Sequence, residues 1–202
     1  MLPLGTLASA RRSGSTVVVS DSFNRANSAS SLGNADTGQA WSSVIGTWGI
    51  DANRAYAVGT PGNTWAAAVN SGANPSTTTI MVSARLYNRG ANRYPAIFLG
   101  AASGAGHTAA YRVFPNGNTT TAYVQNGNTS PASLVACTST DGALFAVRST
   151  PAGANCTVEL LVDGVVLTSI SAPARTGTWC GIGTGFSADA PVRFEDFKVE
   201  TF

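Results

Sequence analysis

The sequence has little charge. Charged residues make up 11% of its 202 residues, against about a quarter of a typical globular chain. The net charge is +2, and Arg11-Arg12 is the only pair of adjacent basic residues. This excludes a basic surface for nucleic acid, which needs clustered lysine and arginine. Disorder is excluded as well, because 44% of the residues are hydrophobic and supply enough apolar surface for a core.

Long hydrophobic runs are also missing. No segment reaches the roughly 18 apolar residues expected of a membrane-spanning helix. The N-terminal stretch differs from a secretory signal peptide, because Pro3 and Gly5 interrupt it and the arginine pair follows its apolar residues instead of preceding them. We therefore expect a protein that is made in the cytoplasm without export, with neither membrane nor nucleic acid among its partners.

Catalytic groups are few. The single histidine, His107, lies in a glycine-rich segment typical of an exposed loop. Glycoside hydrolysis needs two carboxylates about 5 to 9 Å apart, and along a strand only alternate residues share a face. Glu195 and Asp196 are adjacent, so we expect them on opposite faces. We predict on this ground that the chain is not an enzyme.

The cysteines show no metal-binding or redox pattern. Cys137, Cys156 and Cys180 are widely spaced and form no C-x-x-C motif. Free cysteine is among the most buried residue types, so we expect three buried thiols. A disulfide between Cys137 and Cys156 is the alternative.

Acidic residues do not cluster as calcium-binding loops require. We expect no cofactor and no metal site, and calcium held by loop aspartates is the alternative. Asp21 and Asp196 are instead expected to cap turns or to pair with Arg25 or Arg193. The candidate calcium ligands are Asp21, Asp36, Asp51 and Asp196.

What the chain has in abundance is β-type runs separated by turn residues, with no helical period longer than one turn. The pattern predicts an all-β, antiparallel two-sheet β-sandwich over residues 17–202, preceded by an extended N-terminal arm over residues 1–16. The clearest separators, which close tight hairpins, are Pro61-Gly62, Asn116-Gly117, Asn126-Gly127, Asp141-Gly142 and Asp163-Gly164. The predicted strands span residues 17–23, 46–51, 54–58, 64–70, 77–87, 94–101, 109–114, 120–125, 132–137, 143–149, 155–162, 165–171, 178–186 and 191–200.

Two segments near the C-terminus indicate which of their faces is buried. In residues 156–162, alternate positions from Cys156 to Val162 are apolar and should face the core. Residues 179–186 alternate glycine with larger residues, so we expect another group to pack closely against the bare face. We also expect Trp41, Trp48 and Trp179 in the core.

Residues 21–48 carry a more specific pattern. Asp21-Ser22-Phe23-Asn24-Arg25-Ala26-Asn27 is followed by Leu32-Gly33-Asn34-Ala35-Asp36-Thr37-Gly38, and then by Trp41 and Trp48. This pattern resembles the start of concanavalin A/laminin G-like jelly-roll domains in minor tail proteins of phages that infect actinobacteria. The resemblance implies a concanavalin A-like jelly roll whose last strand lies beside the first, with Asp196-Phe197 near Asp21-Ser22-Phe23.

The same resemblance implies a phage virion structural protein, in the first place a minor tail protein that binds host cell-surface glycan. Such a protein is made in the host cytoplasm and located in the virion. Its partners are other virion proteins, copies of itself and host cell-wall glycan. The assembly arm comprises Leu2, Leu4, Leu7, Arg11 and Arg12. A capsid decoration or head-fibre protein without ligand, and a secreted carbohydrate-binding module, are the alternatives.

Glycan binding needs aromatic faces for the sugar rings and short polar groups for the hydroxyls. Aromatic residues in or beside the middle strands, next to asparagine-rich loops, are the candidates. They are Trp65, Tyr87, Tyr94, Tyr111 and Tyr123. Simple packing of these rings at strand edges is the alternative. The low charge favours a neutral glycan over an anionic polymer.

Overall fold

The computed structural model describes residues 14–59, 65–87, 94–103, 109–115, 120–127, 133–138, 140–185 and 192–202. All regular elements named within these residues are β-strands, which confirms the predicted all-β class. No helix in these ranges is long and apolar enough to cross a membrane. Several predictions fall outside the described residues, namely those on Leu2, Leu4, Leu7, Arg11, Arg12, His107, Pro61-Gly62 and Asn116-Gly117.

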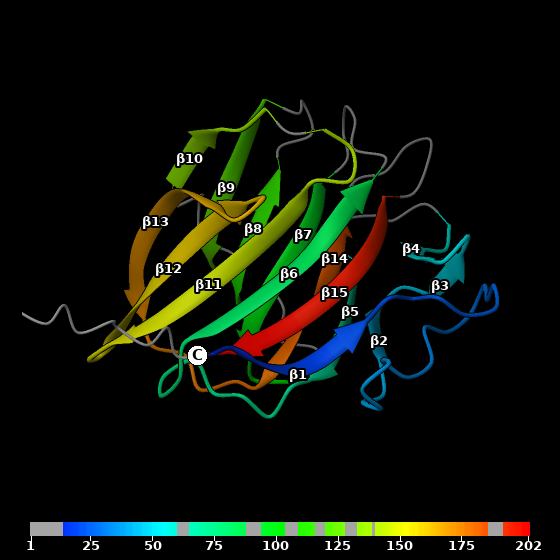
Figure 1. Ribbon diagram of the computed structural model, residues 1–202, viewed down its shortest axis with the longest axis horizontal. Helices are drawn as coiled ribbons and strands as arrows, with labels where there is room; N and C mark the ends of the chain where they lie inside the picture. Colours follow the sequence, from blue (N-terminus) through cyan, green and yellow to red (C-terminus); the bar gives the residue numbers. More distant parts are fainter. Residues whose placement is uncertain are drawn as a thin grey trace, which may run out of the picture.

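Two antiparallel sheets pack face to face, as Figure 1 shows, and confirm the predicted sandwich. The front sheet has the order β13 (Val165–Pro173), β12 (Asn155–Val162), β11 (Leu144–Ala152), β6 (Ile80–Tyr87), β15 (Arg193–Thr201), β4 (Arg54–Ala57) and β3 (Trp48–Asp51), and β1 (Thr16–Asp21) pairs with β15. The back sheet has the order β10 (Ser133–Ala136), β9 (Thr121–Asn126), β8 (Tyr111–Pro115), β7 (Tyr94–Ala101), β14 (Trp179–Gly185), β5 (Trp65–Asn70) and β2 (Ser42–Ile45). The sequence pattern did not predict β2.

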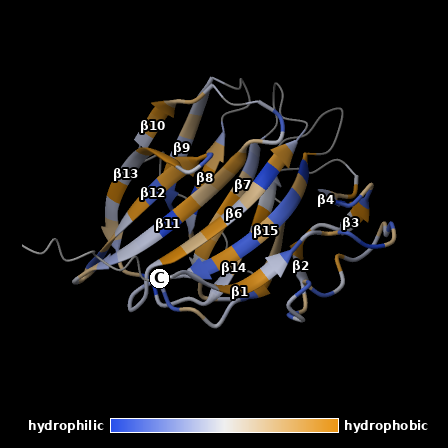
Figure 2. Cartoon of the chain, in the orientation of Figure 1, coloured by the Kyte–Doolittle hydropathy of each residue, from blue (hydrophilic) through white to orange (hydrophobic). Residues whose placement is uncertain are grey.

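Alternation along the strands places one apolar face of each sheet in the core. In β12, Cys156, Val158 and Leu160 are fully buried, which confirms the predicted face. They belong to the same buried cluster as Ile97 and Ile182 of the back sheet. Figure 2 shows apolar residues concentrated on the strands, with polar residues interspersed along β15. The core between the sheets is therefore continuous.

Turn chemistry sets the strand register. Asp163 and Gly164 have positive φ angles of 49° and 81°, as a two-residue type I′ hairpin requires. The turn places Val162 opposite Val165 across β12 and β13. The hairpin predicted at Asp163-Gly164 is therefore confirmed.

The first and last strands are neighbours, as the resemblance implied. Asp21 of β1 lies opposite Phe197 of β15, and β15 also pairs with β6 along its other side. β4 pairs with the start of β15 at Arg193 and Phe194. β1 and β4 thus lie along the same edge of β15, and the chain leaves this edge at Ser22.

Candidate functional site

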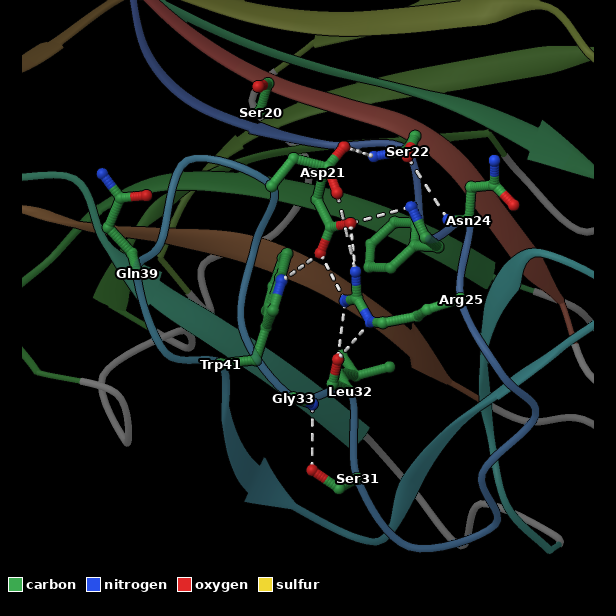
Figure 3. Close-up of polar contacts among 12 residues, drawn as sticks. Ser20, Asp21, Ser22, Asn24, Arg25, Ser31, Leu32, Gly33, Gln39 and Trp41 are labelled. Carbon is green, nitrogen blue, oxygen red and sulfur yellow. Dashed lines mark hydrogen bonds and ion pairs between the residues drawn. The ribbon is translucent and has the colours of Figure 1, made fainter.

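Residues 21–41 fold into a clasp around the carboxylate of Asp21, shown in Figure 3. This side chain is 0% exposed. It accepts hydrogen bonds from Arg25 Nη1 and Nη2 at 2.8 and 2.7 Å, from Trp41 Nε1 at 2.6 Å and from the Phe23 amide at 2.7 Å. A carboxylate has about four lone-pair positions, so this one is fully occupied.

The remaining groups of the Asp21 clasp tie the loop to itself and to β15. Arg25 Nε and Nη2 donate to the Leu32 carbonyl at 2.9 and 2.6 Å. The Trp41 ring centroid lies 5.7 Å from that of Phe23 and 4.9 Å from that of Phe197. The expected pairing of Asp21 with Arg25 is confirmed. The residues that carry the sequence pattern therefore stabilise the fold, and a ligand site has to be sought elsewhere.

Tyr111, one of the predicted glycan-binding residues, lies in the core. It is 0% exposed, and its hydroxyl donates to the Pro173 carbonyl at 2.7 Å. Burial raises the pKa of this tyrosine well above its usual value. The prediction of a stacking role for Tyr111 is wrong, because β8 points it inward together with Val113.

The other predicted aromatic residues lie on two opposite surfaces. Tyr87 is half-buried on the outer face of the front sheet, where the guanidinium of Arg54 lies 3.8 Å from its ring centroid. Tyr94 and Tyr123 are half-buried on the outer face of the back sheet, since their neighbours in the strands point into the core. β5 begins at Trp65, whose side chain is not among those described. These residues therefore do not form one site.

The outer face of the back sheet has a floor of very small residues. Ala66, Ala68 and Phe98 form a second buried cluster on this face. A Cβ atom on Gly181 would lie 2.7 Å from Phe98 Cζ and 2.1 Å from the Ala67 carbonyl oxygen. The close packing predicted against the glycine-rich strand is confirmed, and the Ala67 carbonyl and the Phe98 ring make it. Ala66, Ala68 and Phe98 are at most 1% exposed, so this floor lies beneath other side chains, among them Val44 and Trp179, which pack on it.

Aromatic and polar groups flank that floor on β8 and β9. Phe114 and Tyr123 stack with ring centroids 5.0 Å apart and an interplanar angle of 29°. Beside them, Arg112 Nη2 donates to Gln125 Oε1 at 2.6 Å and to the Gly127 carbonyl at 2.8 Å. Arg112 Nε is buried without a hydrogen-bond partner, and burial lowers the pKa of this guanidinium. A stacked aromatic plate beside polar side chains suits a ring-shaped, hydroxylated ligand.

The structure corrects the prediction for Trp179. Trp41 and Trp48 are buried in the core as expected. Trp179 instead is half-buried and packs on the second cluster, on the outer face of the back sheet. Trp179 alternates regularly with Cys180 and Ile182, which face the core, so its outward position follows from the strand period.

A bulge in β15 also overturns the argument from strand alternation for the carboxylates. Asp196 has a φ of 52°, and the pairing with β6 shifts between Glu195 and Lys198. As a result Phe194 and Phe197 both point into the core, and both acids lie on the outer face. Asp196 pairs with Arg85 at 3.0 Å and Glu195 with Arg54 at 3.6 Å. Two carboxylates therefore do share a face.

The candidate calcium ligands and the cysteines can be compared with the predictions made for them. No group of three or more histidine, cysteine or acidic residues in these ranges is arranged to hold an ion. Asp196 pairs with Arg85, and the expected partner Arg193 instead binds Asp51 at 2.6 Å. Cys137, Cys156 and Cys180 are buried and are not disulfide-bonded, so the Cys137–Cys156 disulfide is not formed.

Comparisons with known proteins identify solved structures of similar fold. No protein-family model matches the chain, and no curated protein matches it. Among solved structures, an endo-1,3-beta-glucanase from Streptomyces sioyaensis is similar with a TM-score of 0.64 and 14% identity, covering 96% of this chain and 99% of that one. A carbohydrate-binding module, CBM66, from Bacillus subtilis is similar with a TM-score of 0.52 and 15% identity, covering 79% and 94%.

A third similar structure is an endo-acting O-glycanase of the human gut microbiota, with a TM-score of 0.55 and 13% identity, covering 93% of this chain and 100% of that one. At these identities the likeness shows the jelly-roll fold. The prediction that the chain is not an enzyme has to be withdrawn, because structures of this fold that match nearly its whole length include two glycan-cleaving enzymes. The resemblance to phage tail proteins stays a prediction.

Proposed function

We propose that this chain is a carbohydrate-binding jelly-roll domain that binds glycan on the outer face of its back sheet. The observation that carries the proposal is the partly exposed Phe114–Tyr123 stack on the outer face of β8 and β9. Sugar rings present an apolar C–H face and a polar rim of hydroxyls. An aromatic plate beside polar side chains matches both, and such sites combine apolar surface with a few placed polar groups.

The known proteins of this fold support the same ligand class. A glucanase, an O-glycanase and a carbohydrate-binding module all have names that state action on or binding to glycans. The low overall charge, 11% of residues, favours a neutral glycan.

The finer part of the proposal is the biological setting, a minor tail protein of a phage. Residues 17–202 form the binding domain, and residues 1–16 are an arm that contacts other virion proteins or further copies of the chain. Its support is the pattern of residues 21–48. Deletion of residues 1–13 should leave a folded domain that no longer enters particles. Normal incorporation of the shortened chain would remove this part of the proposal.

Binding is tested with an array of neutral and acidic glycans, followed by Tyr94→Ala and Tyr123→Ala. Tyr87→Ala is the matched control, because Tyr87 lies on the opposite sheet. We expect neutral glycans to give the signal and both back-sheet variants to weaken it about tenfold, with the control unchanged. Single-domain affinity should be modest, and many copies on one particle would raise it by roughly 10² to 10⁴. If no glycan binds, a decoration or head-fibre role takes the place of this function.

Glycan hydrolysis is a second candidate, and the β15 bulge is the observation that favours it. Glu195 and Asp196 share one face there, and a hydrogen bond to Glu195 is the main cause that raises the pKa of Tyr87. Release of reducing ends from laminarin, lost in Glu195→Gln and retained in Glu159→Gln, would establish it. Glu159 is a fitting control because it pairs with Arg148 on the same outer face. Equal release by both variants would exclude Glu195 as the acting group.

A further inference from the structure

A groove of about 570 Å³ opens beside Trp179, on the part of the back sheet formed by β2, β5 and β14. Strand β7 separates β14 of this groove from the Phe114–Tyr123 stack, which belongs to β8 and β9. The groove has Trp179 on one side and short polar residues, Gln39, Ser42, Asn70 and Ser71, on the others. None of the residues that line it carries a charge.

The position of Trp179 is fixed by its neighbours. A Cβ atom on Gly177 would lie 2.1 Å from the Ala101 carbonyl oxygen, so only glycine lets the chain enter β14 this close to β7. Trp179 then lies opposite Asn70 of β5 and packs on the second cluster with Ala68. The indole is therefore held in place from below while it remains partly open to solvent.

The wall formed by residues 70–72 is equally rigid. Asn70 Oδ1 accepts a hydrogen bond from the Gly72 amide at 3.0 Å. The amide and hydroxyl of Ser71 donate to the Thr178 carbonyl at 3.0 and 2.8 Å. With Oδ1 used in the turn, the Nδ2 group of Asn70 keeps two donors for a ligand.

The opposite wall is anchored to β1. Gln39 Nε2 donates to the Val18 carbonyl at 2.9 Å, and its Oε1 accepts from the Thr37 hydroxyl at 2.5 Å. The side chain of Gln39 is thus held in one position. Ser42 of the exposed strand β2 supplies a hydroxyl group on this side of the groove. A site whose groups are held before binding loses little freedom when a ligand arrives.

The chemistry of the lining selects the ligand. An indole face attracts the apolar face of a ring, and amide and hydroxyl groups match sugar hydroxyls as paired donors and acceptors. The hollow on the front sheet differs in kind, because Asp36, Asp196, Arg85 and Lys198 line it. An anionic sugar would find no cation among the residues that line the Trp179 groove.

We infer that the Trp179 groove is a second, separate subsite for one pyranose ring of a neutral glycan. The inference rests on the proposed function, since it adds a subsite to the same sheet. The ring stacks on Trp179, and Asn70 Nδ2 and the Ser42 hydroxyl bind its hydroxyls. A glycan chain long enough to reach both places would contact the groove and the aromatic plate of β8 and β9 together.

The test is titration of the full chain with laminarihexaose and mannohexaose, with hexagalacturonate as the anionic comparison. Trp179→Ala should weaken binding of a neutral probe at least about tenfold, as truncation of a central aromatic anchor does. Asn70→Ala should weaken it less, and hexagalacturonate should not bind at the groove. Ser42→Trp fills the groove without removing a packed residue, so it gives the same answer if Trp179→Ala folds poorly.

The control Tyr123→Ala separates this inference from the proposed function. Loss of binding in Trp179→Ala and Ser42→Trp, with residual binding in Tyr123→Ala, supports the subsite. Unchanged binding in both groove variants, with loss in Tyr123→Ala, overturns the subsite and leaves the proposed function intact. Absence of binding to either neutral probe in the parent chain overturns both.

Discussion

Substitution of Asp21 by asparagine tests whether the Asp21 clasp stabilises the domain. Asparagine keeps the shape of the side chain but removes its charge and replaces one acceptor oxygen by an amino group. Trp41 Nε1 and Arg25 Nη2 both donate to the same oxygen, Oδ2. Oδ1 also accepts a hydrogen bond from the Phe23 amide. In either orientation of the introduced side-chain amide, its Nδ2 group would therefore face a donor and lose a hydrogen bond.

The expected loss is about 3 kcal/mol of unfolding free energy. Breaking a buried ion pair by changing one partner costs about 3 to 5 kcal/mol. The lower end applies here because the side chain of Arg25 is 26% exposed and regains some hydration. Asp36→Asn is the matched control in the same segment. The Asp36 side chain is 45% exposed, and its Oδ1 lies 3.8 Å from Arg25 Nη1. Asp36→Asn should therefore lower the free energy of unfolding by less than about 1 kcal/mol.

Equilibrium unfolding in urea, followed by tryptophan fluorescence, measures both variants. With a slope of about 2 kcal/mol per molar, Asp21→Asn should lower the midpoint by about 1.5 M and Asp36→Asn by less than about 0.5 M. A midpoint for Asp21→Asn within about 0.3 M of that for Asp36→Asn would refute the reasoning.

Three further predictions concern the core and the back sheet. Gly181→Ala should lower the free energy of unfolding in urea by about 3 kcal/mol through overpacking, because its Cβ would lie 2.1 Å from the Ala67 carbonyl oxygen. Gly14→Ala is the control and should be neutral, because nothing lies within 4 Å of its Cβ. Equal urea midpoints of the two variants would contradict this prediction. Burial raises the pKa of the Cys180 thiol to about 11, so thiol reagents at about pH 8.5 should label it only after unfolding, and rapid labelling of the native chain would count against this structure of the core. The pKa of Tyr111 is raised from its usual value of 10.0 in the folded state, mainly by burial, so its contribution to stability is complete below about pH 10 and is lost as the pH rises further. Tyr111→Phe should therefore lose less stability than the parent chain between about pH 9 and 11 in urea unfolding, and equal losses would mean that Tyr111 is not the titrating group.

The fold was predictable where local chemistry and alternation agree. Asp163-Gly164 closes a hairpin because both residues adopt positive φ, and Cys156 to Val162 show which face is buried. The strands around these turns follow directly. The short strand Ser42–Ile45 was missed because only one of its residues is partly buried and none is fully buried, so it leaves no apolar alternation in the sequence.

The candidate site was less predictable, because bulges change which face a residue occupies. The bulge at Asp196 brings it to the same face as Glu195, and nothing in the residue types signals that bulge. Trp179 had a signal, because it alternates with Cys180 and Ile182, which face the core. The burial of Tyr111 had a signal in its alternation with Val113, which is also in the core. The role of Asp21 was hidden for a different reason, since its partner Trp41 comes from a distant point of the loop.

Mapping of backbone amide chemical shifts during titration with the strongest neutral glycan of the array tests the central claim most directly. We expect the shifts to concentrate on the back sheet, at β5, β8, β9 and β14, while β1, β6, β11 and β15 of the front sheet stay unchanged. Shifts confined to the front sheet, around Glu195 and Asp196, would contradict the proposed function and place the glycan at the β15 bulge.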